Sequence, residues 1–111
     1  MDKLAKYREI VRQVIFEYAT HKPYHGQIDV APFIDSERDR YQVVHVGWDG
    51  ARRVHGCTVH IDIIGYKVWI QYDGSSSPVA EALMEAGIPS KDIVLGFYPQ
   101  EVRQYTGLAI S

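Results

Sequence analysis

Residues 59–72, VHIDIIGYKVWIQY, decide the fold of this chain. On both sides of Gly65-Tyr66 the apolar residues recur at every second position, which is typical of strands that bury one face. Gly65-Tyr66 itself suits a two-residue type II′ hairpin loop, because that turn requires glycine first. Pairing outward from the loop predicts Ile63–Val68, Ile61–Ile70 and Val59–Tyr72 on the buried face, and Asp62–Trp69 and His60–Gln71 on the other face.

The same composition, rich in Val, Ile, Tyr and Trp, continues toward the N-terminus. The predicted strands are 27–34, 40–48, 52–64 and 67–73. A polar reversal at 35–39 separates the first two, and Asp49-Gly50, the favoured dipeptide of a type I′ loop, separates the next two. This loop would place Val44 opposite His55 and Val46 opposite Arg53. Four strands in up-and-down order predict an antiparallel meander.

Helical patterns flank the strands on both sides. Residues 3–20 carry an apolar stripe at three- and four-residue spacing, with Asp2 as the N-cap and His21-Lys22-Pro23 as the stop. A second helix is predicted to begin with Ser77 as N-cap and Pro78 as its first residue, and to end at Gly87. Its predicted inner side consists of Val79, Leu83 and Met84.

The last part of the chain predicts a short apolar strand at 93–97 and a short helix from Pro99 to Tyr105. The expected fold is therefore an α+β single domain over residues 1–111. It has an N-terminal helix, a four-stranded antiparallel meander, then a helix, a short strand and a C-terminal short helix. The length fits one domain, since domains typically hold roughly 100–150 residues.

Composition excludes several classes of protein. The chain has 111 residues, a formal net charge of −2 and 46% hydrophobic residues. The hydrophobic content favours a folded domain, and the net charge disfavours a basic surface that binds nucleic acid. Cys57 is the only cysteine, so an intrachain disulfide and a cysteine zinc cluster are excluded. No apolar run approaches the ~20 residues that span a bilayer. We expect a cytoplasmic protein with no membrane segment.

The histidines are the first candidates for catalytic chemistry. His60 and Asp62 share one strand face, and the Asp49-Gly50 loop would bring His45 to the same face. These three residues are the candidate for an alternative function, a metal-dependent hydrolase. The sequence lacks the HExxH-type spacing of metal motifs and the Glu-x-Lys signature of small nucleases, and Cys57 has neither a positive helix end nor an obvious base beside it. We therefore expect no enzyme activity, no metal and no cofactor.

The predicted polar-aromatic face is the stronger candidate for function. Its members are Tyr41, Val43, His45, Thr58, His60, Asp62, Trp69 and Gln71. Trp, Tyr and His beside aliphatic residues are typical of a protein interface. Three occupants stay open: a partner protein, the chain's own C-terminal segment and a second copy in a homodimer.

Several segments of the sequence are similar to one protein family. They are Tyr7-Arg8-Glu9-Ile10, Tyr41-Gln42, 46–49, 52–57, 60–63, 67–71, Asp73-Gly74, 87–89, 92–97 and 99–107. The most specific is Glu101-Val102-Arg103-Gln104-Tyr105-Thr106-Gly107. In order and over essentially the whole chain, these segments resemble the XisI family.

The resemblance implies a role in DNA rearrangement. XisI proteins are controlling factors for excision of the fdxN element in heterocyst-forming cyanobacteria, where they act with the companion XisH and a separate recombinase, XisF. Many relatives occur as XisH–XisI pairs away from that element. The resemblance thus implies a non-enzymatic controlling factor for site-specific recombination, with an XisH-like partner and a recombinase complex. It carries no catalytic residue to this chain.

The sequence therefore predicts a partner-binding site. Its candidate residues are Trp69, His60, Asp62, Tyr41, Arg103 and Tyr105, the last two in a C-terminal docking segment. The alternative for that segment is packing onto the sheet through Val102 and Tyr105. Direct DNA binding is the competing hypothesis, which the small negative net charge disfavours.

Overall fold

The computed structural model describes residues 2–20 and 26–111, and within them the elements follow a simple order. They are α1 (Lys3–Ala19), β1 (Gln27–Asp35), β2 (Arg40–Asp49), β3 (Arg52–Ile64), β4 (Lys67–Asp73), α2 (Val79–Glu85), a 3-10 helix η1 (Ser90–Asp92), β5 (Ile93–Leu95) and α3 (Gln100–Arg103). The strands form one sheet in the order β1-β2-β3-β4-β5. The fold is α+β, as expected.

The sheet differs from the predicted four-stranded meander, because a fifth strand joins it. β1 to β4 pair antiparallel in chain order, and β5 then pairs parallel to β4. The chain reaches this edge by crossing through α2 and η1, which is the kind of connection that parallel strands require. The apolar run predicts the short strand itself, but it does not predict the strand's parallel place in the sheet.

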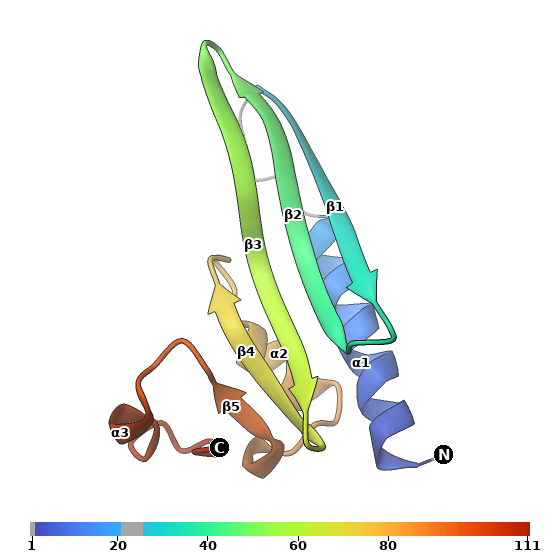
Figure 1. The fold of residues 1–111 in the computed structure, drawn as a ribbon, viewed down its shortest axis with the longest axis vertical. Helices are drawn as coiled ribbons and strands as arrows, with labels where there is room; N and C mark the ends of the chain where they lie inside the picture. Colours follow the sequence, from blue (N-terminus) through green and yellow to red (C-terminus); the bar gives the residue numbers. More distant parts are fainter. Residues whose placement is uncertain (1, 21–25) are drawn as a thin grey trace.

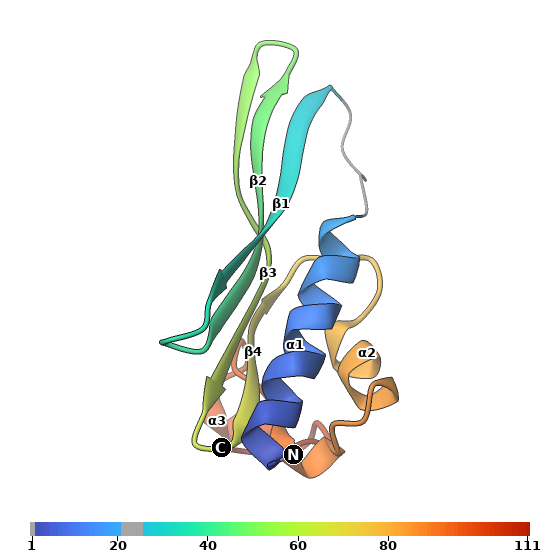
Figure 2. The ribbon, with the colours of Figure 1, turned by 90° about the vertical axis from the view of Figure 1, so that its right-hand side faces the viewer.

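The helices α1 and α2 lie on the same side of the sheet (Figure 2). Figure 1 views the sheet from the opposite side, where β1, β2 and the upper part of β3 face the viewer and no helix of the described residues lies over them. The β2–β3 hairpin extends past the end of β4 and gives the molecule an elongated shape of 44 × 33 × 23 Å.

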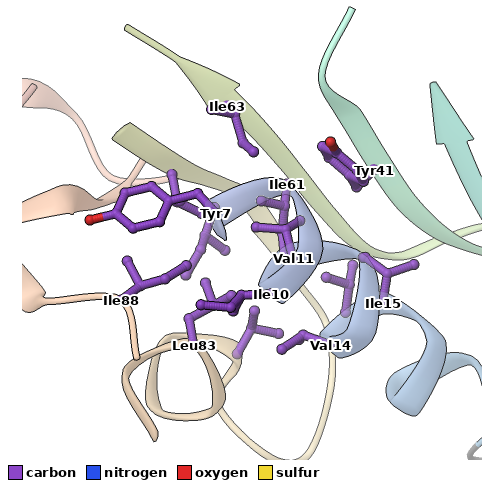
Figure 3. Packing of buried hydrophobic residues seen from close by; sticks show 14 of the residues in the cluster. Tyr7, Ile10, Val11, Val14, Ile15, Tyr41, Ile61, Ile63, Leu83 and Ile88 are labelled. Carbon is purple, nitrogen blue, oxygen red and sulfur yellow. The ribbon is translucent and has the colours of Figure 1, made fainter. Parts of the chain in front are cut away.

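The core lies between α1, α2 and the sheet (Figure 3). From α1 it receives Tyr7, Ile10, Val11, Val14 and Ile15, from the strands Tyr41, Ile61, Ile63, Val68 and Ile70, and from the last third Val79, Leu83, Ile88 and Ile93. Each fully buried aliphatic side chain of this kind contributes about 1.5–3 kcal/mol. The predicted stripe of the first helix therefore faces the core.

The predicted ends of α1 are confirmed where the structure describes them. The Asp2 carboxylate Oδ1 accepts a hydrogen bond of 2.8 Å from the backbone N–H of Ala5, as an N-cap does. The helix ends at Ala19 with Thr20 as its C-cap. The predicted stop signal His21-Lys22-Pro23 lies outside the described residues.

The start of α2 differs from the predicted one. Pro78 occupies the N-cap position, and the first helical N–H, that of Val79, donates to Asp73 Oδ2 at 2.9 Å. A carboxylate at the end of β4 thus replaces the predicted Ser77 cap. The prediction that Met84 lies on the inner side of this helix is also wrong, since its side chain is 38% exposed while Val79 and Leu83 are buried.

The C-terminal end of α2 follows the prediction. Gly87 has a φ of +117°, which favours glycine. Its N–H donates to the carbonyl of Met84, and the N–H of Ile88 donates to that of Leu83, each at 3.1 Å. This pair of bonds is a Schellman motif.

The β3–β4 hairpin has the predicted register near its turn. Ile64 pairs with Lys67, Asp62 with Trp69 and Ile61 with Ile70. Both loop residues have positive φ, +57° at Gly65 and +64° at Tyr66, so the turn has type I′ character rather than the predicted type II′.

The agreement in this hairpin ends at a bulge between His60 and Ile61. Beyond the bulge, His60 pairs with Tyr72 and Val59 with Asp73. The predicted pairs His60–Gln71 and Val59–Tyr72 are therefore wrong. An extra residue in β4 is what shifts the register by one position.

The β2–β3 hairpin differs more. Asp49 pairs with Arg52, so the loop is Gly50-Ala51 rather than Asp49-Gly50. The predicted pairs Val44–His55 and Val46–Arg53 are wrong, because Val44 pairs with Cys57 and Val46 with His55.

A bulge further along β3 changes which residues of β2 are buried. Val44 pairs with Cys57 whereas Val43 pairs with Val59, so Thr58 is the extra residue. Because each extra residue exchanges the two faces of a strand, Tyr41 and Val43 lie on the helix-covered side. Both are buried in the core.

Candidate interaction site

A polar cluster forms where β3, β4 and the C-terminal segment meet on the side of the sheet away from α1. His60 Nε2 lies 2.9 Å from Asp62 Oδ1, as expected for residues two apart on a strand. The amide of Gln71, the bulge residue of β4, donates to the second carboxylate oxygen of Asp62 at 3.2 Å. Both oxygens of Asp62 therefore have a partner within the sheet.

Arg103 from α3 covers the aromatic member of this cluster. Its guanidinium carbon lies 5.0 Å from the ring centroid of Trp69, within the range of a cation–π interaction. The same guanidinium group donates to the carbonyl of Tyr98 at 3.0 Å and to that of Ile110 at 3.3 Å. Arg103 thus joins the loop before α3, the end of the chain and β4.

A glycine lets the C-terminal segment approach the sheet at this point. A Cβ on Gly96 would lie 2.5 Å from Gln71 Oε1 and 3.2 Å from the Trp69 ring. The N–H of Gly96 donates to the carbonyl of Ile70 at 2.8 Å, which extends the pairing of β4 and β5. A larger residue would push the C-terminal segment away from β4.

Beyond Gly96 the chain exposes a group of apolar side chains, which we name the C-terminal patch. Its members are Phe97, Tyr98, Val102, Tyr105 and Ile110. Tyr105 is 81% exposed, the largest exposed fraction among the large apolar residues described. The predicted alternative, that Val102 and Tyr105 pack this segment onto the sheet, does not match their exposure.

Four of the six predicted site residues lie together. His60, Asp62, Trp69 and Arg103 form the polar cluster, and Tyr105 lies just after α3 in the C-terminal patch. The sequence pattern missed the part played by the bulge, which turns Gln71 toward Asp62. Two sequence features could have indicated that the C-terminal segment approaches the sheet. They are Gly96 and the presence of an arginine, Arg103, that can stack on Trp69.

The prediction that Tyr41 belongs to the partner-binding site is wrong, because its side chain is 2% exposed and cannot contact a partner. Its hydroxyl donates to Asp39 Oδ1 at 3.2 Å. Burial, followed by the charge of Asp39, raises the pKa of Tyr41 to about 12. Arg8 also forms a two-point ion pair with Asp39, at 2.8 and 3.0 Å, so Tyr41 belongs to the contact between α1 and the β1–β2 turn.

The metal site that the hydrolase alternative requires is not assembled. His45 lies on the helix-covered side of the sheet, where its Nδ1 is 2.9 Å from Thr58 Oγ1, whereas His60 and Asp62 lie on the other side. Burial, followed by the charge of His55, lowers the pKa of His45. Within residues 2–20 and 26–111, no group of three His, Cys, Asp or Glu side chains is placed to hold a metal ion.

Cys57 has the environment of a structural thiol. Its Sγ donates to the carbonyl of Val59 at 3.0 Å, and burial raises its pKa. A raised pKa reduces the thiolate fraction on which nucleophilic reactivity depends. Cys57 is therefore not suited to act as a nucleophile beside the His60–Asp62 pair.

Two hollows lie on the helix-covered side, away from the polar cluster. One is a cavity of about 450 Å³ between α1, the chain before α2 and the sheet, lined by apolar residues such as Val30 and Val43 and by Ser75 and Ser77. The other lies between α1 and the β1–β2 turn. The polar cluster lines neither of these two hollows.

In the part of the chain that the structure describes, no helix is long and apolar enough to cross a membrane.

The fold and the surface cluster together define an α+β protein with one mixed sheet, whose clustered functional groups are suited to recognition. Residues 1–110 match the family model described as XisI protein. The chain belongs to the XisI family. No protein with a curated description matches it.

Two solved structures from Anabaena variabilis are similar to this chain over nearly its whole length. A XisI-like protein is 36% identical, with a TM-score of 0.90, and the match covers 97% of this chain and 99% of that one. The fdxN element excision controlling factor XisI is 32% identical, with a TM-score of 0.85, and the match covers 99% and 100%.

Proposed function

We propose that this protein is a non-enzymatic controlling factor for excision of a DNA element, and that it acts by binding an XisH-like protein. Membership of the XisI family and likeness to an fdxN element excision controlling factor support the DNA-rearrangement role. The position of His45 on the helix-covered side separates it from His60 and Asp62, which the alternative of a metal-dependent hydrolase requires on one face. Protein contact is then the function that the surface chemistry favours.

The observation that carries this proposal is the C-terminal patch. Exposed aromatic and aliphatic side chains flank Arg103 along this segment, and its guanidinium group is held over Trp69 and by two backbone carbonyls. Aromatic residues and arginine are enriched at the energetic centres of protein interfaces. An arginine that is already positioned also loses less side-chain entropy when a partner binds.

Tyr105 is the residue through which we expect the XisH-like partner to bind most strongly. Its exposed side chain offers a large apolar ring and a hydroxyl at a site that the rest of the described chain does not cover. Next to it, Val102 adds aliphatic area, and the polar cluster of His60 and Asp62 lies beyond Trp69 with charged hydrogen-bonding groups. Together these residues form an apolar centre with a polar rim.

The test is co-expression with an XisH-like protein from the same organism, followed by size-exclusion chromatography of the purified pair. We expect one co-eluting complex, and we expect Tyr105→Ala to weaken the binding at least about tenfold. Tyr66→Ala removes a similarly large exposed ring from the β3–β4 turn and serves as the matched control. Separate elution of the wild-type proteins at micromolar concentration would refute the proposal.

A further inference from the structure

The side of the sheet away from the helices carries five rows of paired side chains over β1, β2 and β3, which we name the open face. From the tip of the β2–β3 hairpin downward, the rows are Gln27–Trp48–Arg53, Asp29–Val46–His55, Ala31–Val44–Cys57, Phe33–Gln42–His60 and Asp35–Arg40–Asp62. Neighbours in a register share a face, so these residues form one continuous surface. Figure 1 shows this side of the three strands facing the viewer.

The open face includes exposed aromatic residues that no other described element covers. Trp48 is 49% exposed, and Phe33 and Val46 are exposed as well. Arg53 lies over the Trp48 ring, 5.2 Å from its centroid. The middle row, Ala31–Val44–Cys57, has only small or medium side chains.

The surface area of the whole molecule is larger than that expected for a compact monomer of this mass. The chain exposes 6937 Å², whereas a compact monomer of 12.7 kDa is expected to expose about 6,200 Å². Its radius of gyration is 14.6 Å, against about 13 Å for a compact domain of this length. The excess of about 700 Å² reflects the elongated shape that the long strands β2 and β3 give the molecule.

The charges on the open face favour a second copy as the occupant. When two open faces pack with a two-fold axis along the middle row and across the strands, the first row of one copy faces the fifth row of the other. Arg53 then faces Asp62, and Trp48 faces Arg40, which gives an ion pair and a cation–π contact on each side of the axis. Strands of opposite sheets stay roughly aligned in such a packing.

We propose that the open face is a self-association surface and that two copies of this chain form a face-to-face dimer through it. The dimer buries Trp48 and Val46 and pairs Arg53 of one copy with Asp62 of the other. This surface is centred on β2 and shares only His60 and Asp62 with the proposed partner-binding surface, and the dimer does not rest on the proposed function.

The first test measures dimerisation of the full chain by sedimentation velocity over about 1 to 100 µM. We expect a dimer for the wild type, and at least about tenfold weaker association for Trp48→Ala, because a central tryptophan carries much of an interface's affinity. Phe16→Ala is the matched control, since Phe16 is also exposed and lies under an arginine, Arg12, but on α1. A monomeric wild type, or equal losses for both variants, overturns the proposal.

The second test exchanges charges between copies. Arg53→Glu alone places the new carboxylate against Asp62, and Asp62→Arg alone places two guanidinium groups together, so each variant is expected to associate at least about tenfold more weakly. Their equimolar mixture contains a heterodimer in which one contact is native and the other is reversed in sign. Recovery of wild-type affinity in the mixture supports the two-fold arrangement, and failure to recover it overturns that arrangement even when a dimer exists.

Discussion

The two sides of the sheet differ in what their side chains contact, although the same strands supply both. The helix-covered side holds Ile61, Ile63, Val68 and Ile70 against α1 and α2, and these residues are almost completely buried. The open face presents Trp48, Val46 and Phe33 to the surroundings. Stability thus depends mainly on the covered side, and the open face and the C-terminal patch are the surfaces that we propose for recognition.

The largest expected effect is on the covered side. Ile70→Ala removes a side chain that is 1% exposed and should lower the free energy of unfolding by about 2–5 kcal/mol. Ile64→Ala is the matched control, because Ile64 lies at the end of the neighbouring strand and is 51% exposed. We expect Ile64→Ala to cost less than about 1 kcal/mol. Urea denaturation measures both, and similar losses would contradict the division between the two sides.

The second effect concerns a buried polar contact at the end of the covered side. The Tyr7 hydroxyl donates to Asp92 Oδ2, and Lys3 Nζ lies 2.9 Å from the same oxygen. Asp92→Asn should cost about 1–3 kcal/mol, because the charged acceptor of a buried hydrogen bond is lost. Asp49→Asn changes an exposed carboxylate in the same way and should have little effect.

The contribution of Asp92 should depend on pH in one direction. Burial raises its carboxyl pKa, but the bonds from Tyr7 and Lys3 outweigh burial and leave the pKa below its usual 3.8. A lowered pKa means that the folded state binds the proton less tightly than the unfolded state. The stability difference between wild type and Asp92→Asn should therefore be full above about pH 4 and should decrease as pH falls further. A difference that grows on acidification would contradict this.

A smaller effect separates two residues that could cap α2. Asp73→Ala removes the acceptor for the Val79 N–H and should cost about 1 kcal/mol. Ser77→Ala removes only the hydroxyl that the sequence pattern favours as the cap, and should cost clearly less. Thermal denaturation of the two variants in one buffer gives the comparison. A larger loss of stability for Ser77→Ala than for Asp73→Ala would indicate that Ser77 is the cap.

The smallest effect is expected in the polar cluster. Asp62→Asn keeps the shape of the side chain and its contact with Gln71, and it lies on a partly accessible surface. We expect the free energy of unfolding to change by less than about 0.5 kcal/mol, while association between copies weakens. A large loss of stability would show that this cluster is part of the structural core.

The sequence predicts features that depend on neighbouring residues. The cap at Asp2, the end of α2 at Gly87 and the register from Ile61 to Ile70 all follow from local rules. Prediction fails where one distant contact decides between local options. Asp73 caps α2 because the fold brings the end of β4 to Val79, and no pattern around Ser77 contains that information.

The candidate site shows the same limit. The turn dipeptide predicts the wrong side for Tyr41, because it indicates a register without a bulge. The grouping of His60, Asp62 and Trp69 is correct, since two-residue spacing and the Asp62–Trp69 pair need only the local hairpin. The stacking of Arg103 on Trp69 depends on how the C-terminal segment folds back, and only the structure supplies that contact.

The bulge at Thr58 also has a genetic consequence. Losing this one codon would remove the extra residue, and the pairs Val44–Cys57 and Val43–Val59 would then be consecutive in a regular ladder. Tyr41 and Val43 would stay on the helix-covered side, and His60 and Asp62 would stay on the other side. The faces of β2 and β3 therefore agree with or without this residue, so relatives of this chain should tolerate a one-residue difference in length at Thr58.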